Sequence, residues 1–146
     1  MKTNIATTRE QSSRLLRCGV SADTADMTLR TETGEVNFSR YSLETELKFY
    51  GYDDPKRHIE IVPAWSLSAL LGLLSKETKV DESPYDEVQR YVLLIYPFMG
   101  GWEVDYQYCE NDECHCLKCV HGTDPIEACV QLIEWLTENG YKLNEQ

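Results

Sequence analysis

Apolar and polar residues alternate without a break between residues 102 and 108, and this pattern constrains the fold more than any other. Successive side chains of a β-strand point to opposite faces, so strict alternation predicts a strand with two different faces. We therefore expect residues 102–109 to form a strand that is apolar on one side and acidic on the other. The apolar residues are Trp102, Val104, Tyr106 and Tyr108, and the polar ones are Glu103, Asp105 and Gln107.

Two further strands are expected beside this one. Residues 91–96 form a continuous apolar run within a predicted strand at 87–96, which is typical of a central strand covered on both faces. A turn at 97–101 precedes the alternating segment, and the polar residues 110–113 separate it from a third strand at 114–121. Because short connections join antiparallel strands, the sequence predicts an antiparallel sheet of at least three strands.

Three segments carry helix signals, in which an apolar stripe follows a capping residue. Thr8 and Gln11 have the spacing of a capping box, and Ser66 and Asp124 are suitable N-cap residues, the latter followed by Pro125. Apolar residues then recur at the spacing of one helix face. The predicted helices cover residues 8–18, 66–76 and 124–139. Helices packed against an antiparallel sheet define an α+β fold.

The rest of the chain carries weaker signals. We expect a helical turn at 21–27, short strands at 28–30, 35–38, 46–50 and 58–62, and a polar connection at 79–85. The chain has 146 residues, close to the commonest domain size, and no internal repeat divides it. One domain spanning residues 1–146 is therefore predicted.

Four segments of the chain form a recognisable set. They are TADM at 24–27, PAWSLSALL at 63–71, WEVDY at 102–106 and PIEACVQLIEWLTENGY at 125–141. Together they resemble a group of small, uncharacterised proteins common in gut Bacteroidetes and their phages, in which a Pro-aromatic-Ser-Leu helix start precedes a hairpin and a C-terminal WL-ENGY helix. That group has no assigned activity, cofactor or catalytic residue. The resemblance therefore implies a phage or mobile-element context without a particular chemistry.

The net charge of −11 is concentrated in one part of the chain. Residues 81–146 hold 14 acidic residues and only three basic ones, and so carry the whole of it. Nucleic-acid binding depends on Lys and Arg that neutralise phosphates, so direct binding to DNA or RNA is not expected. An acidic surface instead attracts a basic protein partner.

The leading hypothesis is a non-enzymatic accessory or interaction protein. Its acidic sheet face would centre on Glu103, Asp105 and Asp112, and Trp65 is expected to be exposed because it precedes a helix start. The sequence contains no Gly-rich phosphate loop, no GxSxG and no HExxH motif, and no enzyme activity is predicted.

The chain is expected to be cytoplasmic. The longest nearly apolar stretch, residues 61–74, is shorter than the roughly 20 residues of a membrane-spanning helix. The first 20 residues lack the apolar block of a signal peptide. Disulfides are rare in a reducing compartment, so the cysteines are expected to be free thiols there.

A cluster of cysteines suggests an alternative, a zinc-stabilised domain. Cys109, Cys114, Cys116 and Cys119 lie within 11 residues, with His121 as an alternative ligand. Zinc prefers four sulfur or imidazole ligands in a tetrahedron, and no other cofactor is predicted. In an extended strand, however, Cys114 and Cys116 face opposite to Cys119. The strand at 114–121 would therefore have to bend for the three sulfur atoms to converge.

A third hypothesis treats residues 116–119 as a redox-active CxxC pair. Lys118 lies between the two cysteines and would favour a thiolate through its positive charge. Such pairs usually occur at a helix start within a βαβ unit, whereas this one falls in a predicted hairpin.

Overall fold

The segments with the strongest strand signals form the larger of two sheets. The computed structural model describes residues 4–32, 35–50, 59–81 and 88–144. The strands β4 (Glu77–Asp81), β5 (Val88–Phe98), β6 (Gly101–Glu110) and β7 (Glu113–Gly122) pair antiparallel in that order. The three predicted strands and the α+β class are confirmed. The predicted connection at 79–85 is wrong for residues 79–81, which pair with β5, and its remainder lies outside the described residues.

A second sheet has three strands, and two of its residues, Leu29 and Ala64, form a smaller apolar cluster with Ala6. Its central strand β1 (Met27–Glu32) pairs antiparallel with β2 (Glu35–Ser39) and β3 (Ile59–Ala64). The short strands expected at 28–30 and 35–38 are confirmed, as is the one at 58–62 apart from His58, which lies outside the described residues.

The strand expected at 46–50 is wrong, because these residues belong to the helix α2 (Leu43–Tyr50). The Ser42 hydroxyl accepts a hydrogen bond from the Thr45 backbone N–H at 3.2 Å and so caps the helix. Glu44 and Lys48 then form an ion pair one turn apart, at 3.4 Å. These local interactions outweigh the strand propensity of the aromatic residues at its end.

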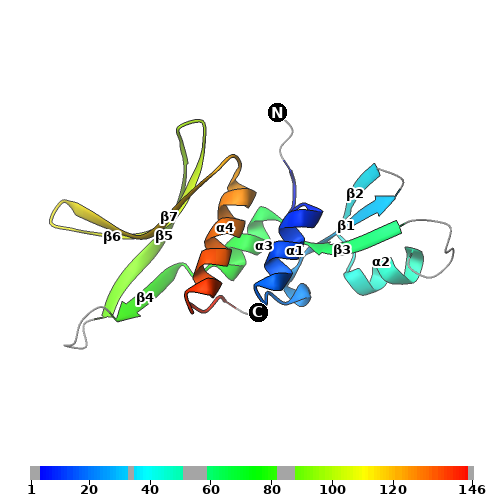
Figure 1. The fold of residues 1–146 in the computed structure, drawn as a ribbon, viewed down its shortest axis with the longest axis horizontal. Coiled ribbons are helices and arrows are strands. Elements are labelled where there is room, and N and C mark those ends of the chain that lie inside the picture. The colour runs from blue at the N-terminus through cyan, green and yellow to red at the C-terminus, as the bar shows by residue number, and fades with distance from the viewer. Residues whose placement is uncertain (1–3, 33–34, 51–58, 82–87, 145–146) are drawn as a thin grey trace.

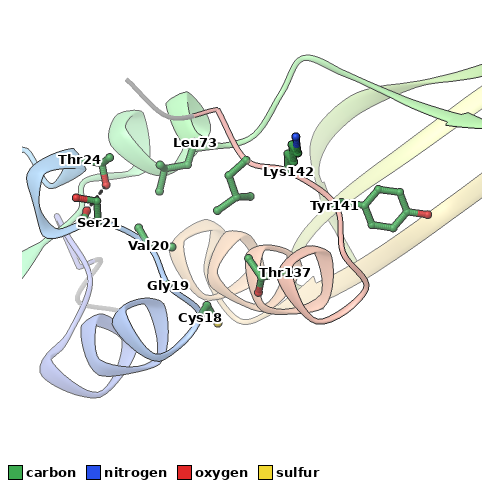
Figure 2. Close-up of a pocket in the computed structure, with 10 residues that line it drawn as sticks. Cys18, Gly19, Val20, Ser21, Thr24, Leu73, Thr137, Tyr141 and Lys142 are labelled. Carbon is green, nitrogen blue, oxygen red and sulfur yellow. Dashed lines mark hydrogen bonds between the residues drawn. The ribbon is translucent and has the colours of Figure 1, made fainter.

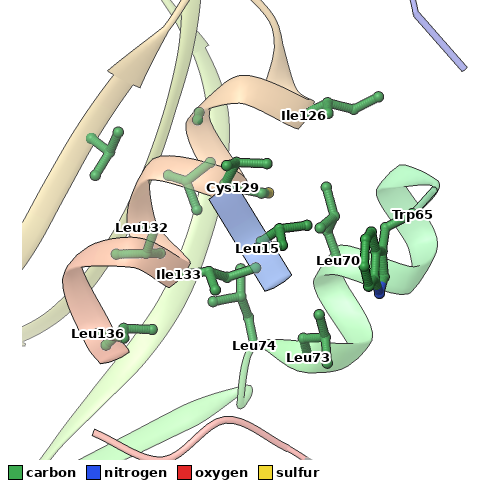
Figure 3. Packing of buried hydrophobic residues seen from close by; sticks show 14 of the residues in the cluster. Leu15, Trp65, Leu70, Leu73, Leu74, Ile126, Cys129, Leu132, Ile133 and Leu136 are labelled. Carbon is green, nitrogen blue, oxygen red and sulfur yellow. The ribbon is translucent and has the colours of Figure 1, made fainter. Parts of the chain in front are cut away.

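Three helices lie between the two sheets (Figure 1): α1 (Arg9–Arg17), α3 (Leu67–Leu73) and α4 (Pro125–Glu138). Helix α4 packs on β6 and β7 and also contacts α1 and α3. The main core fills the space where these helices meet the large sheet (Figure 3). Its fully buried side chains include Leu15, Leu70, Val104 and Ile133.

The capping residues read from the sequence act as predicted at all three helices. The Thr8 hydroxyl accepts from the Gln11 backbone N–H, and the Gln11 side chain accepts from the Thr8 backbone N–H. Ser66 and Asp124 cap α3 and α4 by accepting from the backbone N–H groups of Ala69 and Glu127, but the expected capping box at α4 is wrong, because the Glu127 carboxylate binds Gln11 and Arg14 instead. Gly19, with φ of +90°, ends the first helix, and the short 3₁₀ helix Ala22–Thr24 supplies the helical turn expected at 21–27.

Helix α3 ends three residues before its predicted limit. Leu74 adopts an extended conformation with ψ of 124°, so the helix ends there and the chain continues towards β4. The Leu74 side chain is buried in the main core.

Among the described helices, none combines the length and the apolar character that a membrane-spanning helix needs.

Candidate functional site

The large sheet has one face covered by helix α4 and one face that the helices leave open (Figure 1). Val104 and Tyr106 point to the covered face and are fully buried. We call the opposite side the outer face. Its residues include Arg90, Val92, Leu94, Tyr96 and Phe98 from β5, Glu103, Asp105, Gln107 and Cys109 from β6, and Cys114, Cys116, Cys119 and His121 from β7.

A β-bulge brings the two free cysteines of β7 to the same face. Lys118 pairs with Tyr106, but Cys116 pairs with Gln107, so Leu117 is an extra residue on β7. An extra residue shifts the alternation of side chains by one. Cys116 and Cys119 therefore both lie on the outer face. The bulge provides the departure from a regular strand that their convergence needs.

One tyrosine hydroxyl joins two carboxylates on the outer face. The Tyr96 hydroxyl donates to Glu103 Oε2 at 2.7 Å and to Asp105 Oδ2 at 2.9 Å. Gln107 Nε2 donates to both oxygens of Asp105, at 2.9 and 3.0 Å. The hydrogen bond to Glu103, burial and the hydrogen bond to Asp105 raise the pKa of Tyr96 well above its ordinary value.

This network corrects the expected acidic face. Asp105 is 2% exposed, and Glu103 keeps only 16% of its side-chain surface exposed. The two carboxylates therefore do not form an open, solvated surface. Asp112 is exposed, in the tight turn between β6 and β7, where Asn111 and Asp112 both have positive φ.

The two free thiols lie against these carboxylates. Cys119 Sγ donates to Glu103 Oε2 at 3.3 Å, and the sulfur atoms of Cys116 and Cys119 and one Asp105 oxygen lie within 4.8 Å of one another. Burial and the hydrogen bond to Glu103 raise the pKa of the Cys119 thiol to about 12. Burial and the nearby Asp105 charge also raise the pKa of Cys116. Both groups are therefore protonated thiols at neutral pH.

The structure does not give the CxxC segment the positive neighbour expected from the sequence. Lys118 lies on the opposite face of the sheet, with its Nζ 5.7 Å from the centre of the Trp135 ring. It is held there by a cation–π contact with helix α4. The expectation that Lys118 favours a thiolate is therefore wrong.

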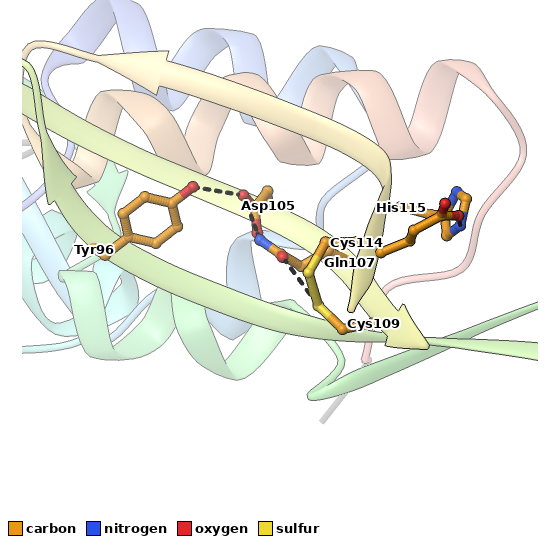
Figure 4. The surroundings of a disulfide bond; sticks show 7 residues. Tyr96, Asp105, Gln107, Cys109, Cys114 and His115 are labelled. Atoms are coloured by element: carbon orange, nitrogen blue, oxygen red, sulfur yellow. Dashed lines mark hydrogen bonds and ion pairs between the residues drawn. A yellow bond between two sulfur atoms is a disulfide. The ribbon is translucent and has the colours of Figure 1, made fainter. Parts of the chain in front are cut away.

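Cys109 and Cys114 form a disulfide that joins β6 to β7 near the hairpin turn (Figure 4). The expectation of free thiols is wrong for these two residues and holds for Cys116 and Cys119. Two sulfurs bonded to each other are not available as zinc ligands, so the four-cysteine site is not formed in this structure. His121 is half-exposed, with its Nδ1 3.9 Å from Glu103 Oε1.

Trp65 is buried, contrary to the expected exposure. It is 0% exposed, and its indole Nε1 donates to the Thr24 hydroxyl at 2.9 Å. Its backbone N–H donates to the Thr7 hydroxyl at 3.0 Å. Trp65 thus connects the segments of Thr7 and Thr24 to the main core and offers no surface to a partner.

Three apolar side chains of β5 are exposed on the outer face, and sequence analysis missed them. Val92 and Phe98 are each 48% exposed, and Leu94 is 40% exposed. The continuous apolar run was expected to be covered on both faces, but helix α4 covers only one.

A separate pocket of about 400 Å³ lies between α1, α3, α4 and the C-terminal segment (Figure 2). Its walls include Cys18, Val20, Leu73 and Thr137, and Lys142 is the one charged residue among its described lining residues. The described lining contains no carboxylate and no histidine.

Comparison of the chain with protein-family models, with curated proteins and with solved structures finds no match.

Proposed function

We propose that this chain is a non-enzymatic interaction module that binds a basic protein segment through the outer face of its large sheet. The observation that carries the proposal is the exposed apolar row on that face. Val92, Leu94 and Phe98 lie along one strand and are each 40% exposed or more. Exposed apolar patches bordered by polar residues are typical of protein interaction sites.

The register of the sheet supports this choice of face. Leu94 pairs with Asp105, and Val92 pairs with Gln107 on the neighbouring strand. An apolar row therefore lies directly beside a row of carboxylates and an amide. A polar row beside the apolar row gives the patch the polar border that is typical of an interaction site.

The charge of the chain favours a basic partner over a nucleic acid. The net charge is −11, and Glu110, Asp112 and Glu113 are exposed at the hairpin turn next to the outer face. These three residues, rather than Asp105, provide the exposed negative charge. Such a surface repels phosphates and attracts lysine and arginine side chains from a distance.

The state of the thiols supports a non-enzymatic role. A catalytic cysteine needs a lowered pKa, whereas burial and the neighbouring carboxylates raise the pKa of both Cys116 and Cys119. The nearest histidine, His121, is directed to Glu103. These residues therefore do not form an activated nucleophile with a base.

The phage or mobile-element context stays a prediction, and so does the cytoplasmic location. The disulfide between Cys109 and Cys114 bears on the location, because disulfides are rare in reducing compartments. Mass spectrometry of protein trapped by alkylation in the producing cell measures whether this bond forms there.

A binding experiment with matched variants tests the proposed surface. The untagged protein is immobilised, and proteins captured from host lysate are identified at low and at high salt. Leu94→Lys adds a positive charge to the proposed surface. Val36→Lys is the control, because Val36 is 56% exposed on β2 of the other sheet.

We expect a basic partner whose capture falls at least about 10-fold with Leu94→Lys, weakens at high salt, and survives with Val36→Lys. The affinity of that purified partner is then measured by calorimetry. Equal capture by all three proteins, or a partner that is acidic, would contradict the proposal.

A further inference from the structure

Cys116, Cys119 and Asp105 form a compact set of potential metal ligands on the outer face. One sulfur from each cysteine and one carboxylate oxygen lie within 4.8 Å of one another. With Zn–S bonds of about 2.3 Å and Zn–O bonds of about 2.0 Å, a tetrahedral zinc ion separates two sulfurs by about 3.8 Å and a sulfur from an oxygen by about 3.5 Å. Side-chain movements of about 1 Å therefore convert the observed arrangement into three zinc ligands.

The backbone creates this arrangement. Residues three apart on a regular strand face opposite sides, and the bulge at Leu117 is what places both sulfurs on one side. The partner strand then supplies Asp105 directly across from Cys119. A ligand set drawn from two paired strands is held by their hydrogen bonds.

Neighbouring side chains fix the orientation of Asp105. Gln107 Nε2 donates to both of its oxygens, and the Tyr96 hydroxyl donates to Oδ2. Hydrogen bonds to a ligating carboxylate orient it and strengthen metal binding. The carboxylate already has such support from two different strands.

The electrostatics of the cluster favour a cation. Asp105 is 2% exposed, and it shares the Tyr96 hydroxyl with Glu103. Among the described residues, no lysine or arginine forms an ion pair with either carboxylate, and His121 lies 3.9 Å from Glu103. A divalent cation would offset the electrostatic repulsion between these two carboxylates, which lie close together in a partly buried site.

We propose that Cys116, Cys119 and Asp105 bind one Zn²⁺ ion per chain, with water as the fourth ligand. On binding, each thiol releases its proton to solvent and its sulfur forms a bond to zinc, and one oxygen of Asp105 forms the third bond. The site does not require Cys109 or Cys114, which remain joined in their disulfide. It lies on the same outer face as the partner surface proposed above, next to Leu94, but it rests on different residues and is tested without a partner.

Metal titration of untagged protein purified under mild reduction, first freed of metal, tests the site. Zn²⁺ is titrated in competition with a chromophoric chelator, and Co²⁺ serves as a spectroscopic probe for thiolate-to-metal absorption. We expect one ion per chain with cobalt absorption of a tetrahedral thiolate site. Cys116→Ser or Cys119→Ser should weaken zinc binding on the order of 100-fold or more, and Gln107→Ala roughly 10-fold.

Two controls separate this site from the alternatives. Cys18→Ser removes a thiol near helix α1 and should leave binding unchanged. The double variant Cys109→Ser/Cys114→Ser should also retain the site, whereas a four-cysteine site would be lost. A zinc stoichiometry well below one, or binding that survives Cys119→Ser, or binding that is lost in the double variant, would overturn the proposal.

Discussion

Leu117 is the extra residue of the bulge in β7, and its effect on side-chain direction determines what the outer face contains. In a regular strand that kept Leu117 without the bulge, Cys116 would face helix α4, and Cys119 would stand alone beside Glu103. A bulge depends on pairing between two strands, so the sequence of β7 did not specify where it occurs. The same holds for the buried state of Asp105, which accepts a hydrogen bond from the Tyr96 hydroxyl on the neighbouring strand β5.

Tyr96→Phe tests the carboxylate network. The variant removes the hydroxyl that donates to Glu103 and Asp105, and leaves a buried carboxylate with one donor fewer. We expect a loss of about 1–3 kcal/mol in the free energy of unfolding, measured by urea denaturation. Tyr41→Phe is the control, because Tyr41 is exposed, and should change stability by less than about 0.5 kcal/mol. Equal effects of the two variants would show that the network contributes nothing.

The thiols of Cys116 and Cys119 are expected to react slowly despite their exposure. In the presence of a chelator, alkylation at pH 7 should be slower than that of a cysteine in an unstructured peptide, because burial and the neighbouring carboxylates hold the thiolate fraction low. The rate for Cys119 should rise with pH up to about 12, where its thiol titrates. Glu103→Gln should speed the reaction, since it removes a negative charge next to this sulfur.

Mass spectrometry of the labelled peptides measures these rates for each cysteine separately. Rapid labelling of Cys119 at pH 7, or an unchanged rate in Glu103→Gln, would contradict the assigned electrostatics.

At the scale of elements, the parts encoded by local signals were the ones that could be predicted. Capping boxes and apolar periodicity act over a few residues, and they located α1, α4 and the start of α3. The end of α3 and strand β4 depend on packing or pairing with distant residues. Helix α2 depends on a cap at Ser42, which competes with the strand propensity of the segment. Helix α4 also binds α1 through Arg14, which contacts Glu127 at 2.7 Å and also Glu134.

The N-cap of α4 gives a prediction at this scale. Asp124 accepts a hydrogen bond from the Glu127 backbone N–H at 2.9 Å. Asp124→Ala should lower the free energy of unfolding by about 1 kcal/mol, and Asp124→Asn much less, because asparagine also caps helices. Chemical denaturation compares the two variants. Similar losses in both would indicate that the charge of Asp124, rather than its capping, stabilises the helix.

The whole molecule is an arrangement of two sheets with a helical layer between them (Figure 1). One consequence is that helix α4 covers the large sheet on one side only, which leaves the apolar row of β5 exposed. Sequence alone could not show this, because an apolar run does not reveal how many elements cover it. The burial of Trp65 has the same origin, since contacts with Thr7 and Thr24 come from segments far apart in the sequence.

The claim that the outer face binds a partner is tested most directly by crosslinking inside the producing cell. A photoreactive phenylalanine analogue replaces Leu94 in one version of the protein and Val36 in another, both exposed apolar positions on different sheets. We predict a covalent adduct with a basic protein from position 94 and none from position 36. The same adducts from both positions, or an adduct from position 36 alone, would contradict the account.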